Sequence, residues 1–466
     1  MTVRSFESLT RCVCPSAVTR TSATSTAIYP FAPDRAISPR TTLGDTIPLP
    51  DDIAIRLPMQ RSLGTARQPA EGISPLLARE GHSRPRSLYI HMPFCTHKCH
   101  YCDFYSIVDT RDRQQAFTDR LVRELTTLAA LAGPIDTIFV GGGTPSLLRP
   151  DLWRRLLAAL DDHYDLAALR SGSAEFTVEC NPETVTPELV SVLVEGGVNR
   201  ISMGAQSFDR RHLQTLERRH DPDRLPLACQ HIRAAGITRL SIDLISAVPG
   251  QSIDDWDRDL RTALALRTEH ISAYTLTYES GTAMTARLHR GEFAKASDDL
   301  EADMYEHTVA VLRDAGLDRY EVSNYARPGA ECRHNLAYWR QDFWLAAGPS
   351  ASAHVAGWRW KNTPRLDEYL GTDDDGFAPI CELEQPDPTR ALMDRLMTGI
   401  RLREGVDAAR AIRDATRIGK EQELRAAVHA AEKNAWLTAS GDRWSLTDAG
   451  FLFADRVAAD LIGALI

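Results

Sequence analysis

Three closely spaced cysteines carry the clearest chemistry in this chain. Cys95, Cys99 and Cys102 follow one another with C-x3-C-x2-C spacing, directly after an apolar run. Thiols this close together in a long chain are suited to holding metal rather than to forming disulfides. The other cysteines are scattered and the total of nine is odd, which favours a reducing, cytoplasmic setting. The stretch therefore predicts a metal centre.

Two kinds of metal centre could use these thiols. A zinc ion needs four ligands, and His91, His97 or His100 could supply the fourth. Structural zinc sites usually take their ligand pairs from two separated segments, however, and the chain has no second C-x2-C. A [4Fe-4S] cluster held by three thiolates leaves one iron open for an exchangeable ligand. We therefore expect a cluster.

The composition is that of a globular protein rather than a nucleic-acid binder. The chain has 466 residues, of which 43% are hydrophobic and 25% charged. A net charge of −9 and a pI near 5.9 argue against broad binding to nucleic acid or anionic membranes. No apolar run approaches the roughly 18 residues that a transmembrane helix requires.

The elements that must position the cysteines alternate between strand and helix. We predict strands at 87–91, 136–140, 175–179, 199–203, 238–243 and 271–277. Amphipathic helical segments are expected near 113–132, 150–162, 186–196, 209–235, 253–267 and 299–315. This alternation predicts βαβ units and a parallel sheet, either open and doubly wound or an incomplete barrel.

Polar or glycine-rich clusters stand at nearly every predicted strand end, which favours the barrel. In a (β/α) barrel the carboxyl ends of the strands converge on one mouth, where function concentrates. The predicted fold class is therefore α/β, a partial (β/α)6 barrel of the TIM type with a C-terminal helical, winged-helix-like domain.

Four regions differ in their patterning. Residues 1–82 are rich in Ser, Thr, Arg and Pro without a sustained period, which predicts a disordered extension. The barrel is expected over 83–317, an aromatic-rich extension over 318–385, and the winged-helix-like domain over 386–466. In that last region helical periods at 387–400, 406–416 and 419–434 precede a hairpin and a final helix. It contains no basic recognition helix, so DNA binding is not expected.

The residues around the cysteines resemble a known family. An aromatic residue, Tyr101, stands just before the third cysteine, as in the signature of radical S-adenosylmethionine enzymes. The wider context, from Tyr89 to Cys95 and from Cys102 to Phe104, is similar to oxygen-independent coproporphyrinogen III dehydrogenase and its paralogue, the HemW-type haem chaperone. The similarity runs from about Tyr89 to the C-terminus. It implies a [4Fe-4S] cluster on the three cysteines, with S-adenosylmethionine bound at the open iron.

The resemblance also implies which residues contact S-adenosylmethionine. They are Tyr89, Tyr101, Gly142, Gly143, Thr144, Glu179, Gln206, Arg218 and Asp243. The glycines suit close approach by a charged ligand, because glycine has no side chain. Four of these residues correspond to positions around a second S-adenosylmethionine in the dehydrogenase: Tyr101, Gln206, Arg218 and Asp243. Whether this chain binds one or two S-adenosylmethionine molecules stays open. Taken singly, Arg218 could be a surface charge and Asp243 a helix N-cap.

Two features distinguish the paralogues. The dehydrogenase has a fourth cysteine two residues after the third, where this chain has Phe104, as in the chaperone. Residues 334–339 match the H-N-x-x-Y-W motif associated with haem in the chaperone. The resemblance thus implies that His334 is an axial haem ligand. The alternative is that Tyr338 and Trp339 pack in a core and His334 is satisfied by protein groups.

The expected function is therefore a haem chaperone that binds a [4Fe-4S] cluster, S-adenosylmethionine and haem. It would deliver haem to an acceptor such as a respiratory haem protein, with transient contact with membrane-bound acceptors. The alternative is the enzyme coproporphyrinogen III dehydrogenase, whose radical chemistry acts on propionate side chains. One stretch, residues 348–354, contains Pro349 and fewer glycines than the family's G-x-G-A-H pattern, and we expect an altered loop there.

Overall fold

A sheet of twelve strands dominates the computed structural model, which describes residues 83–371 and 376–466. The predicted extension, residues 1–82, lies outside the described residues. The strand order is β12-β11-β10-β9-β1-β2-β3-β4-β5-β6-β8-β7. Within the described ranges the two edge strands do not pair with each other, so the barrel is incomplete. The predicted fold class is confirmed.

Six parallel strands in chain order form the centre of the sheet. They are β1 (Ser87–Met92), β2 (Thr137–Gly142), β3 (Glu175–Cys180), β4 (Arg200–Gln206), β5 (Arg239–Ser246) and β6 (His270–Thr275). Each lies within a few residues of the strand predicted from β-rich runs. Because the strands are parallel, their carboxyl ends all meet at the same edge of the sheet.

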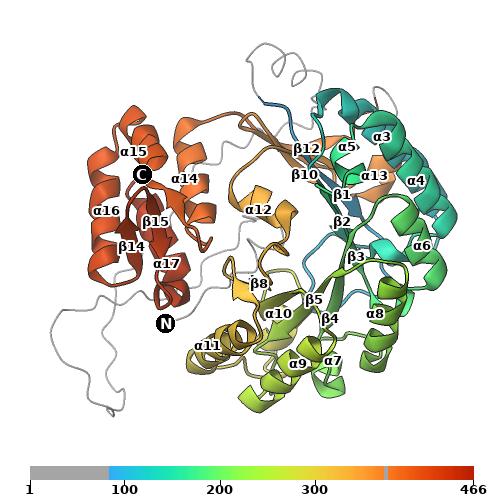
Figure 1. Cartoon of the computed structure of the whole chain (residues 1–466), viewed down its shortest axis with the longest axis horizontal. Coiled ribbons are helices and arrows are strands. Elements are labelled where there is room, and N and C mark those ends of the chain that lie inside the picture. The colour runs from blue at the N-terminus through green and yellow to red at the C-terminus, as the bar shows by residue number, and fades with distance from the viewer. Residues whose placement is uncertain (1–82, 372–375) are drawn as a thin grey trace. The chain divides into compact units, whose positions relative to one another are not determined.

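Helices cover the outer face of this curved sheet (Figure 1). They are α3 (Gln114–Leu128), α4 (Pro150–His163), α5 (Ala167–Arg170), α6 (Pro187–Glu195), α7 (Arg210–Thr215), α8 (Leu225–Ala234), α9 (Ile253–Ala265) and α11 (Asp298–Asp314). Helix α10 (Ala283–His289) instead contacts the cysteine loop, where the Met284 amide donates to the His100 carbonyl. In α4, Leu152, Leu156 and Leu160 are buried at a spacing of four residues. That spacing places them on one helical face, which packs against the sheet.

One predicted helix is in fact two. The segment 209–235 was expected to be continuous, but α7 ends at Thr215 and α8 begins at Leu225. Glu217 has a φ of 53°, in the left-handed region, and Pro222 opens a short 3-10 turn. Both features interrupt helical hydrogen bonding.

The aromatic-rich extension continues the sheet, which the sequence patterns did not predict. It contributes β7 (Asp318–Arg319), β8 (Asn324–Ala326), β9 (Trp344–Ala347), β10 (Ser352–Val355), β11 (Trp358–Asn362) and β12 (Ile380–Glu384), with α12 (Arg333–Trp339) and α13 (Leu366–Gly371). Strand β9 pairs in parallel with β1. All four of its residues are buried, so it lacks the alternation that marks a half-exposed strand.

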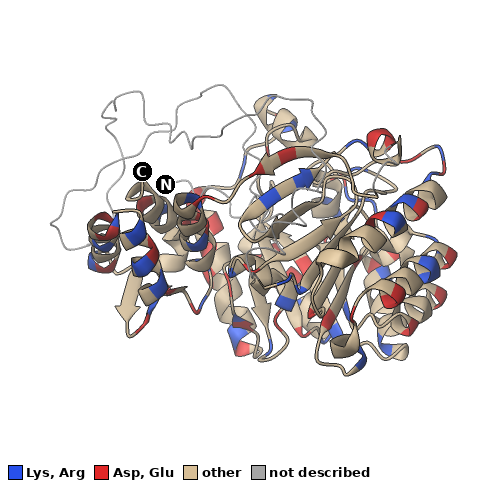
Figure 2. Ribbon diagram, turned by 90° about the horizontal axis from the view of Figure 1, so that it is seen from above, with Lys and Arg blue, Asp and Glu red and all other residues tan. Residues whose placement is uncertain are grey.

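The C-terminal region has a small core of its own. It consists of α14 (Pro388–Gly399), β13 (Val406–Asp407), α15 (Ala408–Arg417), α16 (Glu421–Lys433), β14 (Leu437–Ser440), β15 (Arg443–Leu446) and α17 (Ala454–Gly463). Three helices and a hairpin appear where periodicity predicted them. Acidic and basic residues are interspersed along its helices (Figure 2). No helix in the described ranges is long and apolar enough to cross a membrane.

Candidate functional site

The cysteine loop follows β1 directly and is closed by backbone hydrogen bonds. The amide of Ile107 donates to the carbonyl oxygen of Pro93 at 2.7 Å, and the amide of Cys95 donates to the carbonyl oxygen of Ile107 at 2.9 Å. All three cysteines are free thiols; Cys95 and Cys102 are partly exposed, whereas Cys99 is buried. The loop therefore presents its sulfur atoms at the carboxyl end of the first strand.

The spacing of these sulfur atoms bears on the kind of metal centre. Around one zinc ion, with Zn–S bonds of about 2.3 Å, sulfur ligands lie about 3.8 Å apart. Across the described residues, the three cysteines form no group whose ligand atoms all lie within 4.8 Å of one another. His91, a candidate fourth zinc ligand, pairs through Nδ1 with the Tyr89 hydroxyl at 3.0 Å and through Nε2 with the Tyr105 carbonyl at 2.8 Å. At least one pair of these sulfur atoms therefore lies farther apart than two sulfur ligands of a single zinc ion would.

The glycine-rich loop after β2 packs on the end of β1. The amide of Gly143 donates to the Met92 carbonyl at 2.6 Å, and the amide of Thr144 donates to the Phe94 carbonyl at 2.8 Å. A Cβ on Gly143 would lie 2.7 Å from both of these carbonyl oxygens. The Thr144 hydroxyl lies 3.5 Å from Cys95 Sγ. The protein itself thus fills the space that a side chain at Gly143 would need, and the loop is tied to the cysteines.

Two carboxyl groups lie next to this loop. Gly142, with a φ of 104°, donates its amide to Glu179 Oε2 at 3.2 Å. Burial, and secondarily the charge of Asp243, raise the pKa of Glu179 to about 8. Burial also raises the pKa of Asp243, which accepts hydrogen bonds from the Ser202 hydroxyl at 3.1 and 3.2 Å. Asp243 therefore faces the barrel interior from β5 and caps no helix.

The side chains of Gln206 and Arg218 both lie beside Gly204, near the end of β4. Gln206 has a φ of 64°, a conformation that non-glycine residues seldom adopt and that is frequent at functional sites. A Cβ on Gly204 would lie 2.9 Å from Gln206 Nε2 and 3.2 Å from Arg218 Nη2, so the missing side chain gives both groups room. Arg218 also lies 3.8 Å from Cys99 Sγ. It is consequently part of the site rather than a surface charge.

The two tyrosines occupy different surroundings. Tyr89 stacks on Phe139 of β2, with ring centroids 6.3 Å apart, inside the barrel. Tyr101 is buried in an apolar cluster that also contains Cys99 and Met284. The predicted S-adenosylmethionine contacts thus lie on β1 to β5 or in the segments that follow β1, β2 and β4, and Tyr89 and Asp243 stand inside their strands rather than at the carboxyl ends.

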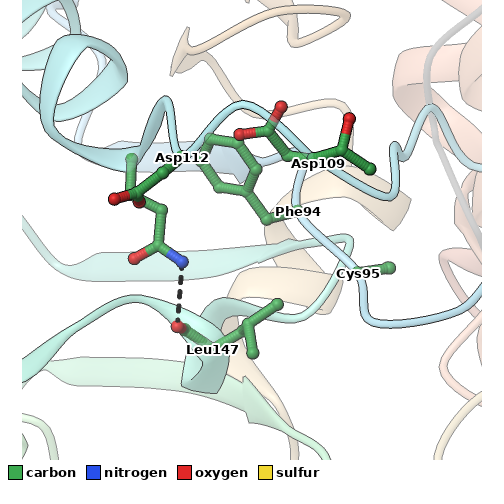
Figure 3. Close-up of a pocket in the computed structure, with 7 residues that line it drawn as sticks. Phe94, Cys95, Asp109, Asp112 and Leu147 are labelled. Carbon is green, nitrogen blue, oxygen red and sulfur yellow. Dashed lines mark hydrogen bonds between the residues drawn. The ribbon is translucent and has the colours of Figure 1, made fainter.

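A cavity of about 230 Å³ flanks the cysteine loop (Figure 3). Phe94, Cys95 and Leu147 contribute to its wall, together with the carboxylates of Asp109 and Asp112. In Figure 3 the Cys95 side chain stands apart from those of Phe94 and the two aspartates. Cys99 and Cys102 do not line this cavity, so it reaches one flank of the loop rather than the space between the three sulfurs.

His334 lies at the other end of the barrel, and the structure does not fit the prediction that it is an axial haem ligand. Its Nδ1 pairs with the Thr137 hydroxyl and its Nε2 with the Tyr338 hydroxyl, each at 2.8 Å. The side chain is fully buried, and burial lowers its pKa to about 3. Thr137 begins β2 and Gly142 ends it, five residues or about 16 Å further on. The ring therefore offers no nitrogen to an iron in this conformation.

The motif that contains His334 instead connects two parts of the protein. The His334 ring stacks on Phe139 at 5.4 Å, and its amide donates to Glu175 on β3. At the other end of α12, Trp339 is buried in the core of the C-terminal helices. Figure 1 shows α12 between the barrel sheet and those helices. This agrees with the alternative of core packing and a satisfied histidine.

The loop that departs from the family's glycine pattern contacts β1. Gly348 has a φ of 96°, and a Cβ there would lie 2.4 Å from the His91 carbonyl oxygen. Its amide donates to the buried Glu124 at 3.0 Å. Ser350 takes a φ of 65°, a conformation that a glycine would adopt without strain.

His220 belongs to the site but was not predicted from the sequence. His220 is 6% exposed, and its Nδ1 accepts a hydrogen bond from Arg218 Nε at 3.0 Å. Its position two residues after Arg218 was the available signal. A histidine in a polar, arginine-rich stretch looks like a surface residue, however, and only the fold buries it.

Comparisons with known proteins agree with this arrangement. Residues 89–263 match the profile of the Radical SAM superfamily, and residues 387–453 match the HemN C-terminal domain. The fold is similar to that of coproporphyrinogen III oxidase (HemN) from Escherichia coli, with a TM-score of 0.72 at 20% identity. That match covers 84% of this chain and 93% of the other.

Curated relatives are similar over most of their length. Heme chaperone HemW of Mycobacterium tuberculosis (strain ATCC 25618 / H37Rv) is 37% identical over 82% of this chain and 95% of its own. Heme chaperone HemW of Bacillus subtilis (strain 168) is 31% identical over 70% of this chain and 86% of its own. The chain therefore belongs to the radical SAM superfamily and, within it, to the family of proteins named heme chaperone HemW.

Proposed function

We propose that this protein is a haem chaperone that binds a [4Fe-4S] cluster, S-adenosylmethionine and haem, and delivers haem to an acceptor protein. The observation that carries the proposal is the cysteine loop, with three free thiols at the mouth and Phe104 where the dehydrogenase family has a fourth cysteine. The relatives named heme chaperone HemW support the same function.

Cys95, Cys99 and Cys102 would hold the cluster and leave one iron free. When bound, the cluster and S-adenosylmethionine would supply the radical chemistry of the superfamily. The chain's own groups would orient the cofactor, with the Gly142–Thr144 loop and Glu179 near its amino-acid part. Because Glu179 is buried and its pKa is about 8, it holds a proton until a cation approaches. An ammonium group beside it would favour the carboxylate and gain an ion pair.

The haem acceptor would be a protein such as a respiratory haem protein, reached through transient contact where it is membrane-bound. The protein would work in a reducing compartment such as the cytoplasm, where the three thiols stay available to iron. Its haem site would not use His334 in the present conformation, since both ring nitrogens are paired.

The experiment compares the two activities in one preparation. Anaerobically reconstituted protein is titrated with haem, and the haem-loaded form is mixed with apomyoglobin as a test acceptor. A parallel sample receives coproporphyrinogen III, reductant and S-adenosylmethionine. We expect haem uptake and transfer without protoporphyrinogen IX. Formation of protoporphyrinogen IX with no haem uptake would establish the dehydrogenase instead.

A further inference from the structure

The Arg218 side chain is held in place beside the predicted cluster by three contacts. Nη2 donates to the Gly204 carbonyl at 2.9 Å, Nε donates to His220 Nδ1 at 3.0 Å, and Nη1 lies 3.8 Å from Cys99 Sγ. A guanidinium is planar, so contacts through all three nitrogens fix both its position and its orientation. The group facing the sulfur is therefore preorganised.

The backbone on both sides supports this arrangement. The amide of Arg218 donates to the Leu213 carbonyl at 2.8 Å, just after Glu217 in its left-handed conformation. The amide of His100 donates to the Leu216 carbonyl at 3.3 Å. The cysteine loop and the segment that carries Arg218 are thus joined directly, and the distance to Cys99 does not depend on a flexible side chain alone.

His220 is an unusual partner for an arginine. Burial, followed by the charge of Arg218, lowers the pKa of His220 to about 3, so its ring is neutral. Because Nδ1 accepts from Arg218, the ring proton is on Nε2. That atom is buried and has no hydrogen-bond partner among the described residues. An unpaired buried donor is unfavourable, and such a group calls for a functional reason.

We propose that Arg218 raises the reduction potential of the cluster through its N–H group and positive charge at Cys99, and that His220 is the positioning residue that orients it. The reduced cluster carries one more negative charge, so a fixed cation beside a ligand sulfur stabilises it relative to the oxidised form. Hydrogen bonds to the sulfur ligands raise the potential in the same direction. This inference rests on the proposed cluster.

The test is a redox titration of the reconstituted cluster, followed by electron paramagnetic resonance, without S-adenosylmethionine. For Arg218→Gln we expect about a tenfold lower ratio of reduced to oxidised cluster at a given potential, which is about 59 mV for one electron. Arg219→Gln is the matched control, since it removes the same charge from the neighbouring, exposed position. Equal potentials for wild type and Arg218→Gln would overturn the proposal.

Variants at His220 test the positioning role separately. His220→Leu removes the acceptor and should lower the potential in the same direction, whereas His220→Gln keeps an acceptor oxygen and should restore most of it. If Arg218→Gln takes up no cluster, His220→Leu still tests the proposal. An unchanged reduction potential in His220→Leu would contradict it. Iron and sulfide content are measured first. A wild type without a cluster would refute the proposed function, while a full cluster with unshifted variants would refute only this inference.

Discussion

The Nδ1 atom of His334 lies 2.8 Å from the hydroxyl oxygen of Thr137, the first residue of β2. This places the histidine of the H-N-x-x-Y-W motif at the amino ends of the strands, opposite the cysteines. The motif therefore packs at the amino ends of the strands and connects the sheet to the C-terminal helices through Trp339. These contacts give the motif a packing role in this chain.

His334→Gln should leave haem affinity within about twofold of wild type while lowering stability. The oxygen and nitrogen of a glutamine amide sit on one terminal carbon rather than on two sides of a ring, so we expect at least one of the two hydroxyls to lose its partner, and an unsatisfied buried group costs about 1–3 kcal/mol. The measurements are haem titration by absorbance and chemical unfolding. Thr137→Val is the companion variant, because it removes the Nδ1 partner but leaves the ring. A folded His334→Gln protein that no longer binds haem would restore the axial-ligand interpretation.

Cys99→Ala should abolish the iron–sulfur absorbance of the reconstituted protein. A cluster held by three thiolates cannot keep its geometry with two, and Cys99 is the member packed against Tyr101 and Arg218. Iron and sulfide analysis gives the same information independently. Cys381→Ala is the control, since this cysteine is exposed and outside the loop. Full cluster content in Cys99→Ala would show that the cluster uses other ligands.

Gly143→Ala should reduce cluster occupancy several-fold in an otherwise folded protein. Its methyl group would lie 2.7 Å from the carbonyl oxygens of Met92 and Phe94, so the two loops must separate. That separation displaces Cys95, which directly follows Phe94. Cluster content per protein is the readout, with circular dichroism to verify folding. Gly463→Ala serves as control because a Cβ there meets nothing within 4 Å. Equal occupancy in the two variants would contradict the prediction.

The carboxyl group of Glu179 should make the protein less stable as the pH rises. In the folded chain its pKa is about 8, against 4.5 for an ordinary glutamate. Between these values the unfolded chain releases a proton that the folded chain keeps, so the free energy of unfolding falls with rising pH.

Glu179→Gln removes this titration. Without S-adenosylmethionine we expect the variant to match wild type near pH 4.5 and to be more stable by a few kcal/mol near pH 8. Urea unfolding at the two pH values measures the difference. The same variant should bind S-adenosylmethionine more weakly, because the amide cannot become an anion. A stability difference that is constant across this range would mean that the carboxyl titrates normally.

Much of the barrel could be predicted because its strands and helices have recognisable local sequence patterns. The apolar spacing of α4 and the β-rich run of β3 need no knowledge of the rest of the chain. Strand β9 could not be predicted, because it is only four residues long and contains no β-branched residue to mark it as a strand. The break between α7 and α8 was missed for another reason: an apolar period can continue across a turn at Glu217 and Pro222.

The sequence by itself determined the cysteine spacing, the order of strands and helices, and the identity of Phe104, since these depend only on residue types along the chain. The tertiary structure alone decided which polar residues meet. Parallel strands bring Glu179 next to Asp243, residues far apart in the chain, and burial then shifts the pKa of each. The fold likewise buries His220 against Arg218 and places His334 beside Thr137, at the amino end of β2. Depth in the fold, and the desolvation that accompanies it, is a property of the packed sheet rather than of any local stretch of sequence.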